Sequence, residues 1–199
     1  MKIIRYTLFA VPVLWFAFFK NGAVNLKPGV LAPNPPEQVN ISSPQSFPFK
    51  NYSVTPLATF HLTAKILAKK KYRWGRESDL SPIDLALGWG KMSDEQILDS
   101  IDISESNRWY RWKVKKFPIP RRELETHSAN MHLVPSSKDI HSKINSARAG
   151  EIVEISGKLI KVTAPDGWRW RSSLSRTDTG SHACELFWVE EFEIHNWVP

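Results

Sequence analysis

Side chains that could perform chemistry gather between residues 127 and 132, and they are His127, Ser128, Asn130 and His132. A serine hydroxyl near histidines supplies two parts of a nucleophilic hydrolase site, which also needs an orienting acid. Asp178 is the acid that we assign to it. The chain has no G-x-S-x-G sequence, and polar loop residues that bond to their own backbone explain the same pattern. A hydrolase site is therefore the alternative interpretation, and a structural loop is the main one.

The spacing of the histidines argues against a metal site. His127 and His132 are five positions apart, which places them on different helical faces and on opposite strand faces, unlike the i, i+4 pair of a zinc-binding helix. We therefore expect no metal ion and no cofactor. Cys184 is the single cysteine, which excludes an intramolecular disulfide. His182 and Cys184 share a strand face in this reading, but a cysteine among apolar neighbours is more often a small buried side chain.

A second group of candidates combines arginines with tryptophans after residue 167. Guanidinium groups donate forked hydrogen bonds and indole rings offer stacking surfaces, so Trp168, Arg171 and Arg176 could bind an anionic or sugar ligand. The structural explanation is that the arginines pair with glutamates of a neighbouring strand and that the tryptophans belong to the core. Both interpretations stay open on the sequence, with the structural one favoured.

The segment RWYRWKVKK, residues 108–116, offers a third candidate surface. Its alternation places Trp109 and Arg111 with two lysines on one strand face, and Arg121 and Arg122 follow closely. Such a face suits single-stranded nucleic acid, polyanionic lipid or glycan. Lysines on an edge strand also prevent strand addition, so the exposed indole of Trp109 is the feature that a structural explanation covers least well.

Four stretches with the period of a β-strand must position these side chains, and they are residues 60–69, 108–116, 151–163 and 183–194. Gly157 in the middle of the third stretch predicts a bulge or a corner. In the tract SPIDLALGWGKMSD, residues 81–94, a proline and two glycines break regular structure and predict a packed loop.

Two short helices complete the predicted elements. Ser93 and Gln96 form a capping box at the start of SDEQILDS, and Ser136 or Ser137 caps a helix over residues 138–147. The fold class that follows is α+β and strand-rich. We expect a curled antiparallel sheet or a small OB-like barrel with two short helices, preceded by an N-terminal apolar helix.

The chain begins with a leader, because Lys2 and Arg5 precede an uncharged apolar run at residues 6–19. This run is shorter than the roughly 17 to 25 residues of a spanning helix, as in a secretory signal. Residues 18–21 are bulky or polar and offer no cleavage signature, which slightly favours an uncleaved anchor. The basic residues predict a domain anchored in the inner membrane and facing the periplasm, or periplasmic or secreted if the leader is cleaved.

Composition divides the rest of the chain into a linker and one domain. Residues 21–48 hold six prolines among polar residues and predict an extended spacer, which leaves residues 49–199 as a single envelope domain. The formal charge of +7 is concentrated in residues 1–50, with five basic and one acidic residue, against 22 basic and 19 acidic residues afterwards. This mild basicity of the domain argues against a dedicated nucleic-acid binder.

Longer stretches carry two resemblances. The run GEIVEISGKLIKV with the turn APDGW, residues 150–162 and 164–168, looks like part of an OB-type barrel. Residues 81–94, 121–135 and 166–190 resemble segments of exported or membrane-anchored proteobacterial proteins without an assigned activity. This second resemblance implies a bacterial source, an envelope location and a single unit after the linker, and it carries over no site residues.

Together these observations predict a non-enzymatic module that binds a protein or glycan of the cell envelope and contacts the inner membrane through residues 6–19. The candidate binding residues are Trp109, Arg111, Arg121, Arg122, Trp168, Arg171 and Arg176. The alternative is a hydrolase-like periplasmic enzyme that uses His127, Ser128 and His132 with Asp178.

Overall fold

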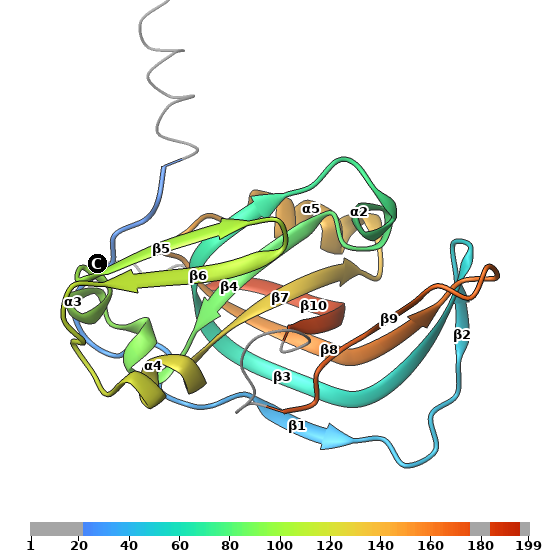
Figure 1. Cartoon of the computed structure of the whole chain (residues 1–199), viewed down its shortest axis with the longest axis horizontal. Coiled ribbons are helices and arrows are strands. Elements are labelled where there is room, and N and C mark those ends of the chain that lie inside the picture. The colour runs from blue at the N-terminus through green and yellow to red at the C-terminus, as the bar shows by residue number, and fades with distance from the viewer. Residues whose placement is uncertain (1–21, 176–183, 196–199) are drawn as a thin grey trace, which may run out of the picture.

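Figure 1 shows the computed structural model, which describes residues 22–175 and 184–195. The predicted apolar helix at residues 6–19 lies outside the described residues. Within them, no helix is long and apolar enough to cross a membrane. The strands are β1 (Glu37–Asn40), β2 (Phe47–Phe49), β3 (Tyr52–Lys71), β4 (Ile83–Gly88), β5 (Ile101–Ser106), β6 (Trp109–Val114), β7 (Ser128–Pro135), β8 (Ile152–Thr163), β9 (Arg169–Arg171) and β10 (Glu185–His195). The helices are α2 (Arg76–Leu80), the 3-10 turn η1 (Gly90–Ser93), α3 (Glu95–Leu98), α4 (Arg121–Thr126) and α5 (Lys138–Ser146).

The elements predicted from periodicity are confirmed. The four predicted strands correspond to β3, β6, β8 and β10, and the predicted second helix is α5. Ser137 caps α5, because its Oγ accepts a hydrogen bond from the Ile140 amide at 3.2 Å. The apolar positions of this helix, Ile140 and Ile144, are buried as their spacing predicts.

Three local predictions are wrong. The tract 81–94 is not a loop but contains β4, all of whose residues are buried. The expected loop around residues 127–132 is the end of α4 followed by β7. The first helix is capped by Asp94 and not by Ser93, because the carboxylate of Asp94 accepts the Gln96 amide at 3.0 Å.

The main sheet curls until its pairings close into a ring. β3 is long enough to pair with β8 from Ser53 to Lys65 and with β4 from Lys65 to Lys71. From β4 the ring continues through β7 and β10 and returns to β8. β7 and β10 run parallel, so the predicted antiparallel sheet is wrong at this one contact. Parallel neighbours need a crossover, and here α5, β8 and β9 lie between them in the chain.

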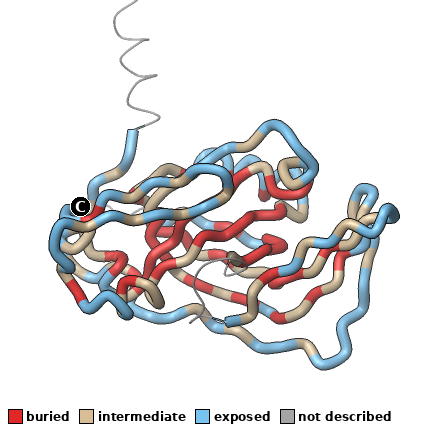
Figure 2. The backbone as a smooth tube through the Cα atoms, in the orientation of Figure 1, coloured by how far each residue is buried: buried red, intermediate tan, exposed pale blue. Residues whose placement is uncertain are grey.

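Buried residues, red in Figure 2, recur along the strands of this ring, and their apolar side chains form its core. Phe60, Leu62 and Ile66 of β3 pack there with Phe187 and Phe192 of β10. Burial of such large side chains contributes about 1.5 to 3 kcal/mol each. The irregularity predicted at Gly157 is present. Only glycine fits at this position, because an added Cβ would lie 2.0 Å from the Trp188 carbonyl oxygen. The register of β10 shifts immediately beyond, between Val189 and Glu191.

The proline-rich stretch, which we predicted to be a spacer, lies against the domain. β1 and β2 both pair antiparallel with β3. Ahead of them, Val24 donates its amide to the Ala149 carbonyl at 2.8 Å, and Gly90 donates its amide to the carbonyl of the buried Ala32 at 2.7 Å. Residues 24–32 therefore form a strap across one end of the ring.

The polar side chains of SDE, residues 93–95, hold this strap. Amides of the strap donate to Glu95 Oε1 at 3.0 Å, to Asp94 Oδ1 at 2.9 Å and to Ser93 Oγ at 3.0 and 3.1 Å. Glu95 is itself fixed by Lys65, whose Nζ lies 2.6 Å from Oε1 and whose side chain is only 2% exposed. The motif that reads as a helix cap in the sequence thus fastens the N-terminal segment to the domain.

Replacing Glu95 tests this fastening. The change Glu95→Ala leaves the buried ammonium of Lys65 without its counter-charge, and we expect the free energy of unfolding to fall by about 3 to 5 kcal/mol in urea denaturation. The control Glu125→Ala breaks an ion pair with the exposed Arg121, and it should cost less than about 1 kcal/mol. Equal small losses in both variants would contradict the role given to Glu95.

Candidate functional site

A hairpin made of β5 and β6 covers the outer face of β4 and β7. The two strands pair in register from Ile101 opposite Val114 to Ser106 opposite Trp109, and Figure 1 shows the hairpin crossing β4. Tyr110 donates its hydroxyl to Ser128 Oγ at 3.3 Å, and Asn130 Nδ2 donates to the Arg108 carbonyl at 3.1 Å. Polar side chains that point outward from β7 are therefore enclosed beneath the hairpin.

The tip of this hairpin carries an arginine in a costly backbone conformation. Asn107 and Arg108 form the two-residue turn with φ of 52° and 62°, a left-handed conformation that costs roughly 1 to 2 kcal/mol for a residue with a side chain. The Arg108 amide donates to the Tyr72 hydroxyl at 2.8 Å. Asparagine tolerates this conformation well, whereas Arg108 needs compensation from the contacts of its side chain.

Asp84 of β4 supplies that compensation at the centre of a buried polar cluster. Its side chain is fully buried, and its Oδ1 accepts hydrogen bonds from Arg108 Nη1 at 3.0 Å and Ser81 Oγ at 3.1 Å. The Nδ1 of buried His132 lies 2.8 Å from Oδ2. Such a charge-assisted cluster is strong when each partner is held in place, so Asp84 ties together β4, β7 and the hairpin tip.

Aromatic rings enclose the Arg108 guanidinium. It lies 4.3 Å from the ring centre of Tyr72 and 5.4 Å from that of Trp170, and Trp170 also contacts the His132 ring at 4.9 Å. Cation–π contacts of this kind add roughly 0.5 to 2 kcal/mol each. Trp170, on β9, therefore contacts both Arg108 and His132 of the cluster.

Glu105 lies beside the cluster on β5. Burial, followed by the negative charge of Asp84, raises the pKa of Glu105 to about 8, although Lys70 and Arg108 act in the opposite direction. At neutral pH this carboxyl therefore holds its proton in the folded chain.

The three described residues of the predicted hydrolase site do not converge. Ser128 donates its hydroxyl to the Leu124 carbonyl at 2.9 Å, and His132 lies four residues along β7, about 13 Å away by strand geometry. His127 follows the last residue of α4, with Nδ1 3.8 Å from Glu123. Asp178 lies outside the described residues. The acid beside His132 is Asp84, which the sequence analysis missed.

The predicted binding residues near the hairpin, Trp109, Arg111, Arg121 and Arg122, are all exposed. Trp109 is 39% exposed, and Arg111 donates to the Ser106 hydroxyl at 2.6 Å. Arg121 donates to Glu125 at 2.8 Å, and its guanidinium lies 6.0 Å from the Trp112 ring. Arg122 is exposed. These contacts are those of the structural interpretation, except that Trp109 keeps an exposed indole.

The second predicted binding group, Trp168, Arg171 and Arg176, is also not gathered around one site in the described residues. Trp168 is half-buried against Tyr52 and Trp170, and Arg76 lies over its ring at 5.4 Å. Arg171 is exposed on β9. Arg176 and His182 lie outside the described residues. Cys184 is partly buried, with its Sγ 3.9 Å from Asn130 Nδ2, so it borders the Asp84 cluster.

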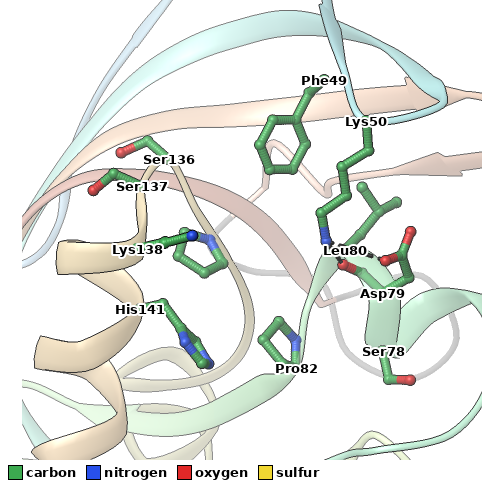
Figure 3. Close-up of a pocket in the computed structure, with 11 residues that line it drawn as sticks. Phe49, Lys50, Ser78, Asp79, Leu80, Pro82, Ser136, Ser137, Lys138 and His141 are labelled. Carbon is green, nitrogen blue, oxygen red and sulfur yellow. Dashed lines mark hydrogen bonds and ion pairs between the residues drawn. The ribbon is translucent and has the colours of Figure 1, made fainter.

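A cavity of about 510 Å³ lies beside α5, next to the ends of β4 and β7 (Figure 3). Its lining comes from the β2–β3 turn, α2 and the start of α5: Phe49, Lys50, Ser78, Asp79, Leu80, Pro82, Pro135, Ser136, Ser137, Lys138 and His141. Lys50 and Asp79 form an ion pair at 3.1 Å across from α5. Lys138 and His141 extend from α5 and are exposed. The walls thus combine Phe49, Leu80 and two prolines with serine hydroxyls, the Lys50–Asp79 ion pair and the exposed Lys138.

Sequence reasoning named none of these lining residues as ligand-binding. The available signal was weak, because the three segments are far apart in the chain. Among the residues that the structure describes, no group of three or more His, Cys, Asp or Glu side chains is placed to hold a metal ion.

Comparisons with known proteins give a distant and partial likeness. The chain is 21% identical to neutral alpha-glucosidase AB of Sus scrofa and 22% identical to that of Homo sapiens, each over 133 residues. These matches cover 65% of this chain, and the chain spans only 14% of the length of these curated relatives. No family model matches the chain. No solved structure matches it either.

The protonation of Glu105 gives a pH test of the cluster. The folded chain retains the proton up to about pH 8 while the unfolded chain loses it near 4.5, so the contribution of this group to stability falls as pH rises between these values. Glu105→Gln should therefore gain stability relative to the unchanged chain between about pH 5 and pH 9, by on the order of 1 to 3 kcal/mol. Chemical denaturation at each pH measures the difference.

Asp102→Asn is the matched control, because Asp102 is exposed on the same strand. Its stability difference from the unchanged chain should not grow with pH in this range. A pH-independent difference for Glu105→Gln would show that the carboxyl is already ionised in the folded state.

Proposed function

We propose that this chain is a membrane-tethered, non-enzymatic binding module of the cell envelope, built on an OB-like barrel. The ring contains five strands, which in chain order are β3, β4, β7, β8 and β10. Around the ring, the first pairs with the second, the second with the third, the third with the fifth, the fifth with the fourth, and the fourth with the first. The third and fifth run parallel, and a helix connects the third to the fourth. This arrangement supports the OB-like assignment, since the OB fold is a five-stranded Greek-key barrel.

The usual ligand-binding face of an OB fold is covered in this chain, and this leads us to place ligand binding in the pocket. OB folds bind oligonucleotides and oligosaccharides on the face of strands two and three and on the adjoining loops. Here the hairpin occupies that face, with Arg108 bonded to the buried Asp84. The pocket beside α5 adjoins the same region through Pro82 and Pro135, the residues next to β4 and at the end of β7. We therefore place ligand binding in this pocket.

The chemistry of the pocket favours an extended, negatively charged segment of a peptide or glycan. Its volume lies in the range of about 300 to 1,000 Å³ that is typical of ligand sites. Lys138 adds positive charge at the start of α5, where the helix dipole also favours anions. Phe49 and the prolines offer flat apolar contact. The single observation that carries the proposal is this convergence of three chain segments on one cavity.

The hydrolase alternative has less support. Ser128 is engaged by Leu124 and Tyr110, and the imidazole of His132 faces Asp84 and Trp170 beneath the hairpin. The name of the distant relatives describes a glucosidase, but the match covers so little of those proteins that we take no activity from it.

Site-specific photo-crosslinking tests the proposal. A photoreactive residue at Ser136, in the pocket, should give one defined adduct in native envelopes that carry the intact chain. The same residue at Val39, which is 68% exposed on β1, should give none. Protease or glycosidase digestion of the adduct then identifies the partner as protein or glycan.

Lys138→Glu provides the matched variant. This residue is exposed at the first position of α5, where an acidic side chain is compatible with the helix dipole, so the fold should be retained. Reversal of charge should lower the Ser136 adduct several-fold. An adduct that is insensitive to this change, or that forms equally at Val39, would contradict binding in the pocket.

A further inference from the structure

The connection between β3 and α2 presents the most exposed large apolar side chain among the described residues. The indole of Trp74 is 91% exposed. Lys70, Lys71, Arg73 and Arg76 surround it in the chain and are all exposed. Tryptophan favours the interface between lipid and water, and basic residues are attracted to an anionic bilayer surface. This segment, residues 70–76, is the basic loop.

Three of these charges have no intramolecular ion pair in the structure. Arg76 pairs with Asp166 at 2.5 Å, and no ion pair is formed by Lys70, Lys71 or Arg73 within the described residues. Lys69 differs from them, because its Nζ donates to the Ile144 and Ala147 carbonyls at 2.7 and 2.6 Å. Burial lowers the pKa of Lys69 to about 8. The basic loop thus begins where this lysine is fixed against the end of α5.

The same part of the domain receives the N-terminal strap. Lys69 is bound to Ala147, and Val24 is bound to Ala149, two residues further along. In Figure 1 the connection from β3 to α2 arches along the upper edge of the molecule, the edge at which the described chain begins. Five residue steps separate the apolar run, which ends at Phe19, from Val24, and they span at most about 18 Å. A membrane that holds residues 6–19 therefore lies close to this edge.

We propose that the basic loop docks on the anionic lipid surface beside the N-terminal anchor, with Trp74 inserted among the headgroups. This inference rests on the membrane tether of the proposed function and adds a second point of contact. Two contacts fix the orientation of the domain, whereas a single tether leaves it free to rotate. Because Ser78 follows Trp74 by four residues, docking places the pocket next to the membrane.

Lipid-borne quenchers measure this contact directly. The intact chain is reconstituted in vesicles of phosphatidylcholine with about one third phosphatidylglycerol, in which part of the lipid carries brominated chains. Tryptophan quenching is compared between the unchanged chain and Trp74→Phe. We expect the variant to lose a component of quenched emission, and we expect the matched variant Trp109→Phe to keep it. High salt should reduce this component, because screening weakens the attraction of exposed charges.

Charge variants complete the test. Lys71→Gln with Arg73→Gln should reduce the Trp74 component several-fold, and Arg169→Gln with Arg171→Gln, exposed on β9, should leave it unchanged. Flotation of the vesicles separates the two proposals. A chain that floats without any quenched Trp74 component contradicts docking and leaves the tether standing. A chain that does not float contradicts both.

Discussion

The contact between Asp84 and Arg108 determines how the outer face of the ring is used. Asp84 is fully buried and the Arg108 side chain is 17% exposed, so the carboxylate would be costly to bury without this guanidinium. Their contact holds the hairpin tip in its left-handed turn and brings Tyr72, His132 and Trp170 together. Because this face is closed, our proposal places the ligand in the open cavity beside α5.

The pairing of the ring strands explains where the basic loop and the strap lie. β3 pairs with β8 and then with β4, so its far end stays in the ring up to Lys71 and leads directly into the connection to α2 that completes the basic loop. The strap held by residues 93–95 reaches the same side through Val24. The strap, the basic loop and the pocket therefore lie on one side of the domain, and the proposed membrane tether and the proposed binding function both use this side.

Periodicity predicted the elements that have one wet and one dry face. β3, β6, β8 and α5 alternate polar and apolar residues because only one side of each is covered. β4 and β7 were missed for another reason. The proline and glycines around β4 and the polar side chains along β7 were interpreted as loop signals, whereas in the structure the core and the hairpin cover both faces of these strands. Asp84 and Arg108 were missed for a related reason, since a contact across 24 residues depends on a hairpin that the sequence pattern did not reveal. The pocket joins three distant segments, and no local signal marks it.

Hydrogen exchange of the intact chain tests most directly that the pocket, and not the covered strand face, receives the ligand. Exchange is compared between native membranes and the purified chain. The account predicts slower exchange in native membranes at residues 78–82 and 135–141, with no change at the hairpin, residues 101–114. Protection gained at the hairpin and at β4 and β7, with none at the pocket, would contradict it.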